Sequence, residues 1–140
     1  MKALYLESSS AVAWCFGETT ASEVIKGMDE AEIVVTSQLT IVEIERAVHR
    51  AVALSLIKEA SARRLRALLA RELMKWITMA LNDSVLARAC RAFPIEPVKT
   101  LDSIHLATAL AFTEAFPDLA VLSLDRRIIA NATALGLASV

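Results

Sequence analysis

The chain has 140 residues, a formal net charge of -1 and hydrophobic residues at 56% of its positions. This length suits one domain with one core, and we expect a single domain over residues 1–140. The near balance of charges argues against a strongly basic surface that coats nucleic acid regardless of sequence, although it does not exclude a local basic patch. The apolar surplus predicts surface for a partner, and a homodimer is one expectation.

Neither the cysteines nor the apolar runs indicate a zinc, redox or membrane protein. Cys15 and Cys90 lack the spacing of a zinc site or a CxxC motif, so we expect two reduced thiols in the core. The apolar run at residues 3–6 is broken by Glu7 and three serines, which makes it too short for a signal peptide. No other apolar run is long enough to cross a bilayer, and we expect a cytoplasmic protein.

The first half of the chain predicts two strands, each followed by helix. Short apolar or β-branched runs mark the strands, at residues 2–6 and 32–36. Helical spacing or an alanine-rich composition marks the helices, at residues 10–16, 21–28 and 38–54. Gly17 can end the first of these helices, and the Ser37 hydroxyl can cap the third.

The second half predicts mostly helix with one further strand. Helical patterns lie at residues 58–81, 85–91, 101–115 and 126–135. Thr100 is a candidate N-cap, and Gly136 fits the end of the last helix. Two prolines within residues 93–97 indicate a loop. The remaining strand covers residues 119–124 and ends at Asp125.

The predicted strands are unbroken apolar runs, and they alternate with helices. A strand that is apolar on both faces is typical of a parallel sheet covered by helices on both sides. The alternation of strands with helices indicates the same architecture. The sequence therefore predicts an α/β domain with a central parallel sheet.

Four acidic residues stand where such a fold binds ligands. Glu7 and Asp125 each end a predicted strand, and ligands of open α/β sheets bind beyond the carboxyl ends of the strands. Asp102 lies in the first turn of a helix, and Glu43 lies in the helix after the second strand. Converging carboxylates repel one another and raise one another's pKa. Mg²⁺ or Mn²⁺, which prefer oxygen ligands, would remove this conflict, so we predict a metal site.

Each acidic residue also has a simpler interpretation. Asp102 is favourable near a helix N-terminus through the dipole alone, and Asp125 can cap the last helix. Glu7 can be a surface residue at a strand end, and Glu43 can lie on a solvated helix face. His105 follows Asp102 by one helical turn and could face the same site. Its apolar neighbours favour a hydrogen-bonded structural histidine instead.

Four segments resemble the motifs of the PIN domain, and especially those of its VapC-type toxins. They are residues 5–11 (YLESSSA), 37–47 (SQLTIVEIERA), 100–109 (TLDSIHLATA) and 122–127 (LSLDRR). Their order and spacing agree with the family over essentially the whole chain. The resemblance implies a PIN-like three-layer α/β/α sandwich with a central parallel sheet.

The resemblance also implies an activity and partners. It implies a metal-dependent endoribonuclease, the toxin of a toxin–antitoxin pair, with RNA as substrate and a cognate antitoxin as protein partner. In this interpretation Ser9 orients a ligand or a water, and Arg126 and Arg127 contact RNA phosphates. The catalytic residues, which would hold Mg²⁺ or Mn²⁺, are Glu7, Glu43, Asp102 and Asp125.

Glu7 departs from the family, which normally has Asp at this position. Its side chain is longer by one methylene, and Mg²⁺ demands near-ideal geometry, so we predict weak or Mn²⁺-favoured activity. The alternative function is a PIN-domain protein that binds antitoxin or RNA without efficient cleavage. A dehalogenase-like phosphatase would need an Asp-x-Asp motif after the first strand, and a dinucleotide-binding enzyme would need a glycine-rich turn there. The chain has neither.

Overall fold

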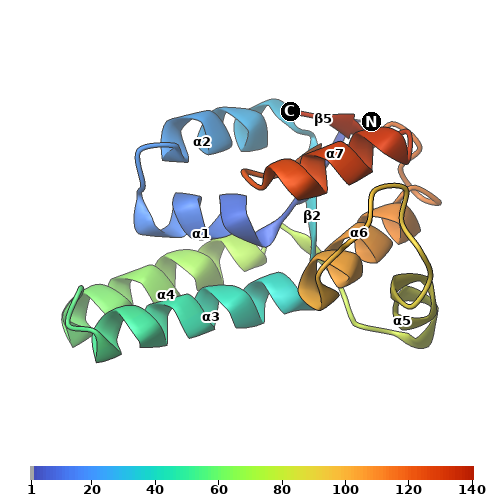
Figure 1. Ribbon diagram of the computed structural model, residues 1–140. Helices are drawn as coiled ribbons and strands as arrows, with labels where there is room; N and C mark the ends of the chain where they lie inside the picture. Colours follow the sequence, from blue (N-terminus) through green and yellow to red (C-terminus); the bar gives the residue numbers. More distant parts are fainter. Residues whose placement is uncertain (1) are drawn as a thin grey trace.

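A five-stranded parallel sheet forms the centre of the computed structural model, which describes residues 2–140 (Figure 1). The order of the strands in space is β3-β2-β1-β4-β5, and every neighbouring pair is parallel. The strands are β1 (Ala3–Leu6), β2 (Ile33–Ser37), β3 (Ile77–Met79), β4 (Ala120–Leu122) and β5 (Ala138–Ser139). The predicted parallel sheet is therefore confirmed.

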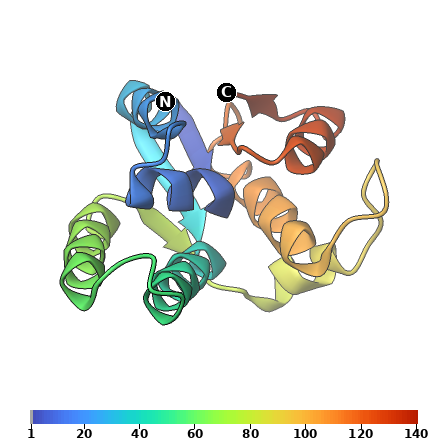
Figure 2. The same ribbon diagram turned by 60° about the vertical axis from the view of Figure 1, so that its left-hand side comes forward.

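Helices cover both faces of the sheet, which gives three layers (Figures 1 and 2). Within residues 2–140 the helices are α1 (Ser8–Phe16), α2 (Ala21–Glu30), α3 (Gln38–Ala53), α4 (Glu59–Leu73), α5 (Asp83–Ala89), α6 (Thr100–Phe112) and α7 (Arg126–Ala134). The first four pack on one face of the sheet, and α6 and α7 pack on the other. α5 packs against α6. The expected α/β/α sandwich is confirmed.

The central strand β1 explains why both faces need cover. Successive side chains of a strand point to opposite faces. Ala3 and Tyr5 therefore join the core beneath α6 and α7, whereas Leu4 and Leu6 join the core beneath α1–α4. All four side chains are at most 1% exposed. A strand buried on both faces has to be apolar throughout, as the sequence pattern indicated.

The structure corrects several predicted boundaries. The helix expected at residues 58–81 ends at Leu73, and β3 follows it unpredicted. β3 is only three residues long and owes its strand conformation to pairing with β2, which local pattern does not show. Thr100 is the first residue of α6 rather than its N-cap, which is Lys99. Cys15 is buried as expected, but Cys90 is exposed because α5 lies at the surface.

Among the helices of residues 2–140, none is both long enough and apolar enough to span a bilayer.

Trp76 joins the start of β3 to α1, and its loss should weaken the fold. The rings of Trp14 and Trp76 are tilted by 60° with centroids 5.3 Å apart, and both side chains are buried. Trp76→Ala should lower the free energy of unfolding by about 3 kcal/mol or more, because it leaves a cavity in the core. Urea unfolding measures this change. Met74→Ala, at a position 88% exposed, is the control, and an equal loss in both variants would contradict the packing role.

Candidate metal centre

The fold carries all four predicted acidic residues, here called the acidic set, toward the carboxyl ends of β1 and β4. Glu7 follows β1 directly, Asp125 lies three positions after the last residue of β4, and each is the N-cap of the next helix. β1 and β4 are neighbours in register, and the Glu7 backbone N–H donates to the Leu122 carbonyl at 3.0 Å. Glu43 comes from α3, and Asp102 comes from the first turn of α6.

Glu7 is a buried carboxylate whose charge is held by serine residues. The residue is 3% exposed. Its Oε2 accepts hydrogen bonds from the Ser9 backbone N–H at 3.0 Å, from the Ser123 hydroxyl at 2.7 Å and from the Ser9 hydroxyl. Its Oε1 lies 2.7 Å from the Ser8 hydroxyl, which can donate to it. A buried charge is costly unless it is hydrogen-bonded, so these donors explain how Glu7 is tolerated in this position.

Two of the same hydroxyls connect the turn after β1 to the turn after β4. The Ser9 hydroxyl accepts from the Leu124 backbone N–H at 2.9 Å, and the Ser123 hydroxyl accepts from the Asp125 backbone N–H at 3.0 Å. Asp125 in turn caps α7, because its Oδ1 accepts from the Arg127 backbone N–H at 2.8 Å. The position of Asp125 is therefore set by a network that starts at Glu7.

Glu43 is held by a second network, which runs through the core. Its Oε1 lies 2.6 Å from His105 Nε2, and its Oε2 lies 3.1 Å from the Ser8 hydroxyl. His105 is 1% exposed, and its Nδ1 lies 2.9 Å from the Tyr5 hydroxyl. Burial, and then the charge of Glu7, raise the pKa of Tyr5 well above its ordinary value, so Tyr5 keeps its proton. A carboxylate can only accept, so the Nε2 N–H of His105 donates to Glu43, and the Nδ1 of a neutral imidazole then accepts from the Tyr5 hydroxyl.

Asp102 is half-buried, and its pKa is raised above the ordinary value of an aspartate. Burial is the largest cause, followed by repulsion from the charges of Asp125 and then Glu7. His105 and Lys99 act in the opposite direction. The carboxylates of Asp125 and Glu7 therefore lie close enough to affect the ionisation of Asp102, and Ser8 links Glu7 to Glu43.

The donors of the acidic set fit a hard divalent cation by their chemistry. Asp102 forms no side-chain hydrogen bond with the described residues, and Asp125 uses only Oδ1, so both have free oxygens. Oε1 of Glu43 accepts one hydrogen bond from His105, and the single Ser8 hydroxyl proton serves Oε1 of Glu7 or Oε2 of Glu43, so all three oxygens have a free lone pair. Glu7 Oε2 already accepts three hydrogen bonds. Oxygen donors of this kind suit Mg²⁺ or Mn²⁺.

The positions of these donors fit less closely than their chemistry. No group of three or more His, Cys, Asp or Glu side chains within residues 2–140 is placed so that it could hold a metal ion directly. The Glu7 and Glu43 carboxylates are instead hydrogen-bonded to serine and histidine donors. Binding of a cation would therefore require the carboxylates to move toward one another.

Arg126 and Arg127 stand beside Asp125 at the first two positions of α7. Both side chains are exposed, and neither forms an ion pair with another residue in the described part of the chain. A cation at a helix N-terminus is unfavourable for the dipole, so the helix itself gives no reason for their presence. The predicted location of these arginines next to the acidic set is thus what the structure shows, whereas contact with RNA stays a prediction.

Sequence reasoning did not identify three polar residues that hold the acidic set. Ser8 and Ser123 donate to Glu7, and Tyr5 donates to His105. All three belong to segments that resemble family motifs. Ser8 adjoins Glu7, but the partners of Ser123 and Tyr5 lie 116 and 100 positions away, and no local spacing reveals them. The structural interpretation of His105 is supported by its burial, and its hydrogen bond to Glu43 gives it a place beside the site as well.

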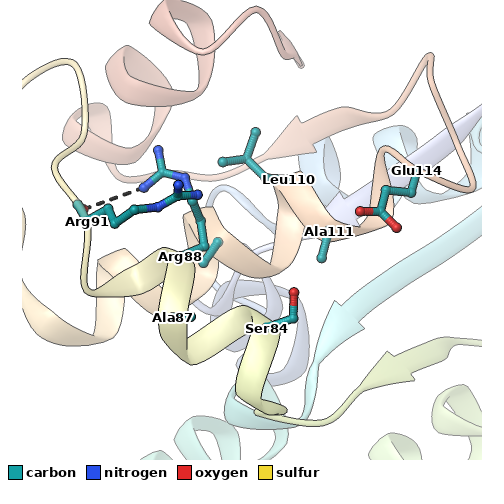
Figure 3. A pocket seen from close by; sticks show the side chains of 8 residues that line it. Ser84, Ala87, Arg88, Arg91, Leu110, Ala111 and Glu114 are labelled. Atoms are coloured by element: carbon teal, nitrogen blue, oxygen red, sulfur yellow. Dashed lines mark hydrogen bonds between the residues drawn. The ribbon is translucent and has the colours of Figure 1, made fainter.

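A pocket between α5 and α6 lies apart from the acidic set (Figure 3). It has a volume of about 510 Å³, and Figure 3 shows Arg88 and Arg91 on one side with Glu114 at the other end. Arg88 lies over the Phe93 ring, 4.3 Å from its centroid, and donates to the backbone carbonyls of Arg91 and Ala92. These contacts give Arg88 a structural role in closing the chain after α5.

Comparison with known proteins places the whole chain beside one family. The family model of the PIN domain matches residues 4–135. No curated protein sequence matches the chain significantly.

Solved structures share the fold at low sequence identity. VapBC2 from Rickettsia felis, bound to a DNA fragment from their promoter, has a TM-score of 0.64 at 9% identity, with 99% of this chain and 97% of that chain covered. FitAB bound to the IR36 DNA fragment has a TM-score of 0.65 at 18% identity, with 100% and 94% covered. FitAcB from Neisseria gonorrhoeae has a TM-score of 0.66 at 18% identity, with 99% and 96% covered.

The serine network predicts a stability loss at Ser123. Ser123→Ala removes a donor to the buried Glu7 carboxylate and the acceptor of the Asp125 backbone N–H. We expect the free energy of unfolding to fall by about 1–3 kcal/mol, since both groups lose a hydrogen bond. Chemical denaturation measures this, with Ser84→Ala on the exposed face of α5 as the control. Equal stability of the two variants would show that the network contributes nothing.

Repulsion within the acidic set predicts the opposite effect at Asp102. Asp102→Asn removes one of three carboxylates that repel one another, so the melting temperature at neutral pH in EDTA should rise. Excess Mn²⁺ should stabilise the wild type more than this variant, because a ligand that binds the folded state raises its stability. Differential scanning fluorimetry measures both effects, with Asp118→Asn in the exposed loop before β4 as the matched control. A lower melting temperature in EDTA for the Asp102 variant would contradict the repulsion.

Proposed function

We infer the function of this protein from one premise: the chain belongs to the PIN domain family. We propose that it is a divalent-metal-dependent endoribonuclease and the toxin of a toxin–antitoxin pair, as its resemblance to VapC-type toxins implies. The observation that supports the proposal is the position of Asp102, Asp125 and Glu7 near the carboxyl ends of β1 and β4, where the charges of Asp125 and Glu7 act on Asp102. Such a position is where open α/β sheets bind ligands.

The residues that would hold the cation are Asp102, Asp125, Glu43 and Oε1 of Glu7, because these have oxygens with free lone pairs. When bound, Mg²⁺ or Mn²⁺ activates water as a nucleophile and neutralises the charge that develops on the phosphate. The role of Asp102 is the most direct, since its carboxylate has no hydrogen bond to give up. His105 and Tyr5 would keep Glu43 in a fixed orientation while the substrate binds.

Other residues of the site would position the RNA and the acidic set. Arg126 and Arg127 are the candidate phosphate contacts, since guanidinium groups form paired hydrogen bonds with phosphate oxygens. The Ser9 hydroxyl donates to Glu7 and accepts from Leu124, so its supporting role would be to orient Glu7. The proposed reaction is hydrolysis of an RNA phosphodiester bond.

A cognate antitoxin is the protein partner that we propose. The similar solved structures are VapBC2 and FitAB assemblies bound to DNA, and the resemblance of this chain to VapC-type toxins points to an equivalent partner. An arginine supplied by such a partner could neutralise the acidic set in place of a cation. A homodimer stays a prediction from the apolar composition.

A catalytically weak binding protein is the second candidate function, and one observation favours it. Oε2 of Glu7 accepts three hydrogen bonds, which leaves this carboxylate less available than the shorter aspartate that the family normally has. If Glu7 serves only as an anchor for the turns after β1 and β4, the protein would bind antitoxin or RNA without efficient cleavage.

Cleavage of a structured RNA in Mg²⁺ or Mn²⁺ tests the two candidates. The wild type should cleave, with Mn²⁺ favoured, and Asp102→Asn should reduce the rate by about a hundredfold or more. Asp118→Asn is the matched control, and it should cleave like the wild type. Gel analysis of end-labelled RNA measures the rates. Cleavage that survives unchanged in the Asp102 variant would exclude the proposed site.

Glu7→Asp separates the two roles of Glu7. If Glu7 is a metal ligand, the variant should retain cleavage and shift its preference from Mn²⁺ toward Mg²⁺, because the family's side-chain length is restored. If Glu7 is only an anchor, the variant should be less stable and no more active. Absence of cleavage by the wild type with either metal would favour the binding protein.

A further inference from the structure

We propose that a groove along α3 binds the stretch of single-stranded RNA that adjoins the cleaved phosphodiester, with Arg46 and Arg50 holding its phosphates. This groove, here called the α3 groove, is separate from Arg126 and Arg127 on α7. The inference rests on the proposed ribonuclease function, because it takes the acidic set as the point where the RNA is cut.

The α3 groove opens at the acidic set itself. It has a volume of about 910 Å³, and Glu43 is one of the residues that line it. Its lining also includes Leu39 and Val42 from the first turns of α3 and Leu101 from the first turn of α6. In Figure 1, α3 starts beside α6 and then runs away from it alongside α4. A polymer that passes the acidic set can therefore continue directly into the groove.

Arg46 and Arg50 form a line that leads away from Glu43. A helix rises about 1.5 Å per residue, so the two arginines lie roughly 4.5 Å and 10.5 Å along the α3 axis from Glu43. Residues three or four positions apart share a face of a helix, and Glu43, Arg46 and Arg50 all line the groove. Guanidinium groups one turn apart suit the successive phosphates of an extended strand, and each can bind two phosphate oxygens.

Arg46 and Arg50 have no acidic partner within the described part of the protein. Both side chains are exposed, and neither is within ion-pair distance of a carboxylate in residues 2–140. Arg66 on α4 shows the contrast, because its Nε donates to Glu45 at 3.0 Å and so joins α4 to α3. The nearest acid in the groove, Glu43, is already hydrogen-bonded to His105. The groove is therefore positively charged beyond its mouth.

The exposed apolar side chains of the groove suit contact with RNA bases better than contact with water. Val42 is 55% exposed and Leu101 is 47% exposed, and they adjoin Glu43 and Asp102 in the chain. Unstacked bases of single-stranded RNA need apolar or planar surfaces, and an arginine plane can supply one as well. Phosphate contacts would set the register of the strand, and these surfaces would cover its bases. Single-stranded RNA has phosphates for the arginines and bases for the apolar side chains, and the groove lies beside the proposed site of cleavage.

Binding of a short fluorescent single-stranded RNA in EDTA tests the inference, with Asp102→Asn as the background so that no cleavage occurs. Replacing Arg46 and Arg50 together by Gln should weaken binding roughly tenfold at low salt and should reduce the slope of log affinity against log salt by about 1.4. Fluorescence anisotropy measures both quantities. The matched control replaces Arg63 and Arg71 on α4 by Gln, since both are exposed, unpaired with acids in residues 2–140, and outside the groove. This control should bind like the background protein.

Several results would overturn the inference. Undetectable RNA binding by the background protein, unchanged binding after loss of Arg46 and Arg50, or an equal loss in the Arg63 and Arg71 control would each do so. A change in oligomeric mass that accompanies the weaker binding, measured by light scattering, would identify the groove as an interface between copies of the chain. Release of RNA by an acidic peptide only in proteins that retain Arg46 and Arg50 would support the cationic groove, whereas peptide binding without any RNA binding would assign it to a protein partner.

The inference and the proposed function can fail separately. If the wild type never cleaves RNA in Mg²⁺ or Mn²⁺ but binding depends on Arg46 and Arg50, the groove is supported and the ribonuclease is not. If the wild type cleaves and the double variant has an unchanged KM, the ribonuclease is supported and the groove is overturned. A raised KM with little change in kcat is the expected result, because arginines outside the acidic set contribute to binding of the substrate more than to its reaction.

Discussion

The buried carboxylate of Glu7 is the constraint on which the site depends. A charge at 3% exposure requires hydrogen-bond donors, and here serine residues from two turns provide them. Ser9 and Ser123 use the same hydroxyls to accept backbone N–H groups of Leu124 and Asp125. Satisfying one carboxylate therefore fixes the relative position of the two turns, and with it the place of Asp125. Structure and site share this network, so a change at Glu7 affects both.

The Glu43 carboxylate is also held by hydrogen bonds, and these begin on the other face of the sheet. Tyr5 points into the core beneath α6, and its hydroxyl meets His105, which then reaches Glu43 on α3. The hydrogen bonds that hold the acidic set therefore come from both faces of the sheet. Buried polar groups that satisfy one another fix a single arrangement of side chains.

The sequence predicts the helices and strands that patterns of neighbouring residues define. β1, β2 and β4 are apolar runs, and the caps at Ser37 and Asp125 are where the pattern put them. β3 was missed because three residues become a strand only by pairing with β2, and β5 is shorter still. The ends of the strands were enough to place Glu7 and Asp125 side by side. The hydrogen bonds from Ser123 to Glu7 and from His105 to Glu43 join residues far apart in sequence, and no local spacing encodes them.

The distribution of charge makes the proposed RNA substrate compatible with a formal net charge of -1. The negative charge gathers at the carboxyl ends of β1 and β4, where burial, and then repulsion from Asp125 and Glu7, raises the pKa of Asp102. Unpaired arginines stand at the start of α7 and along α3, next to this negative centre. An RNA strand would be repelled at the acidic set alone and attracted on its flanks. A cation at the acidic set would reverse the repulsion there, so substrate and metal should bind more tightly together than either does alone.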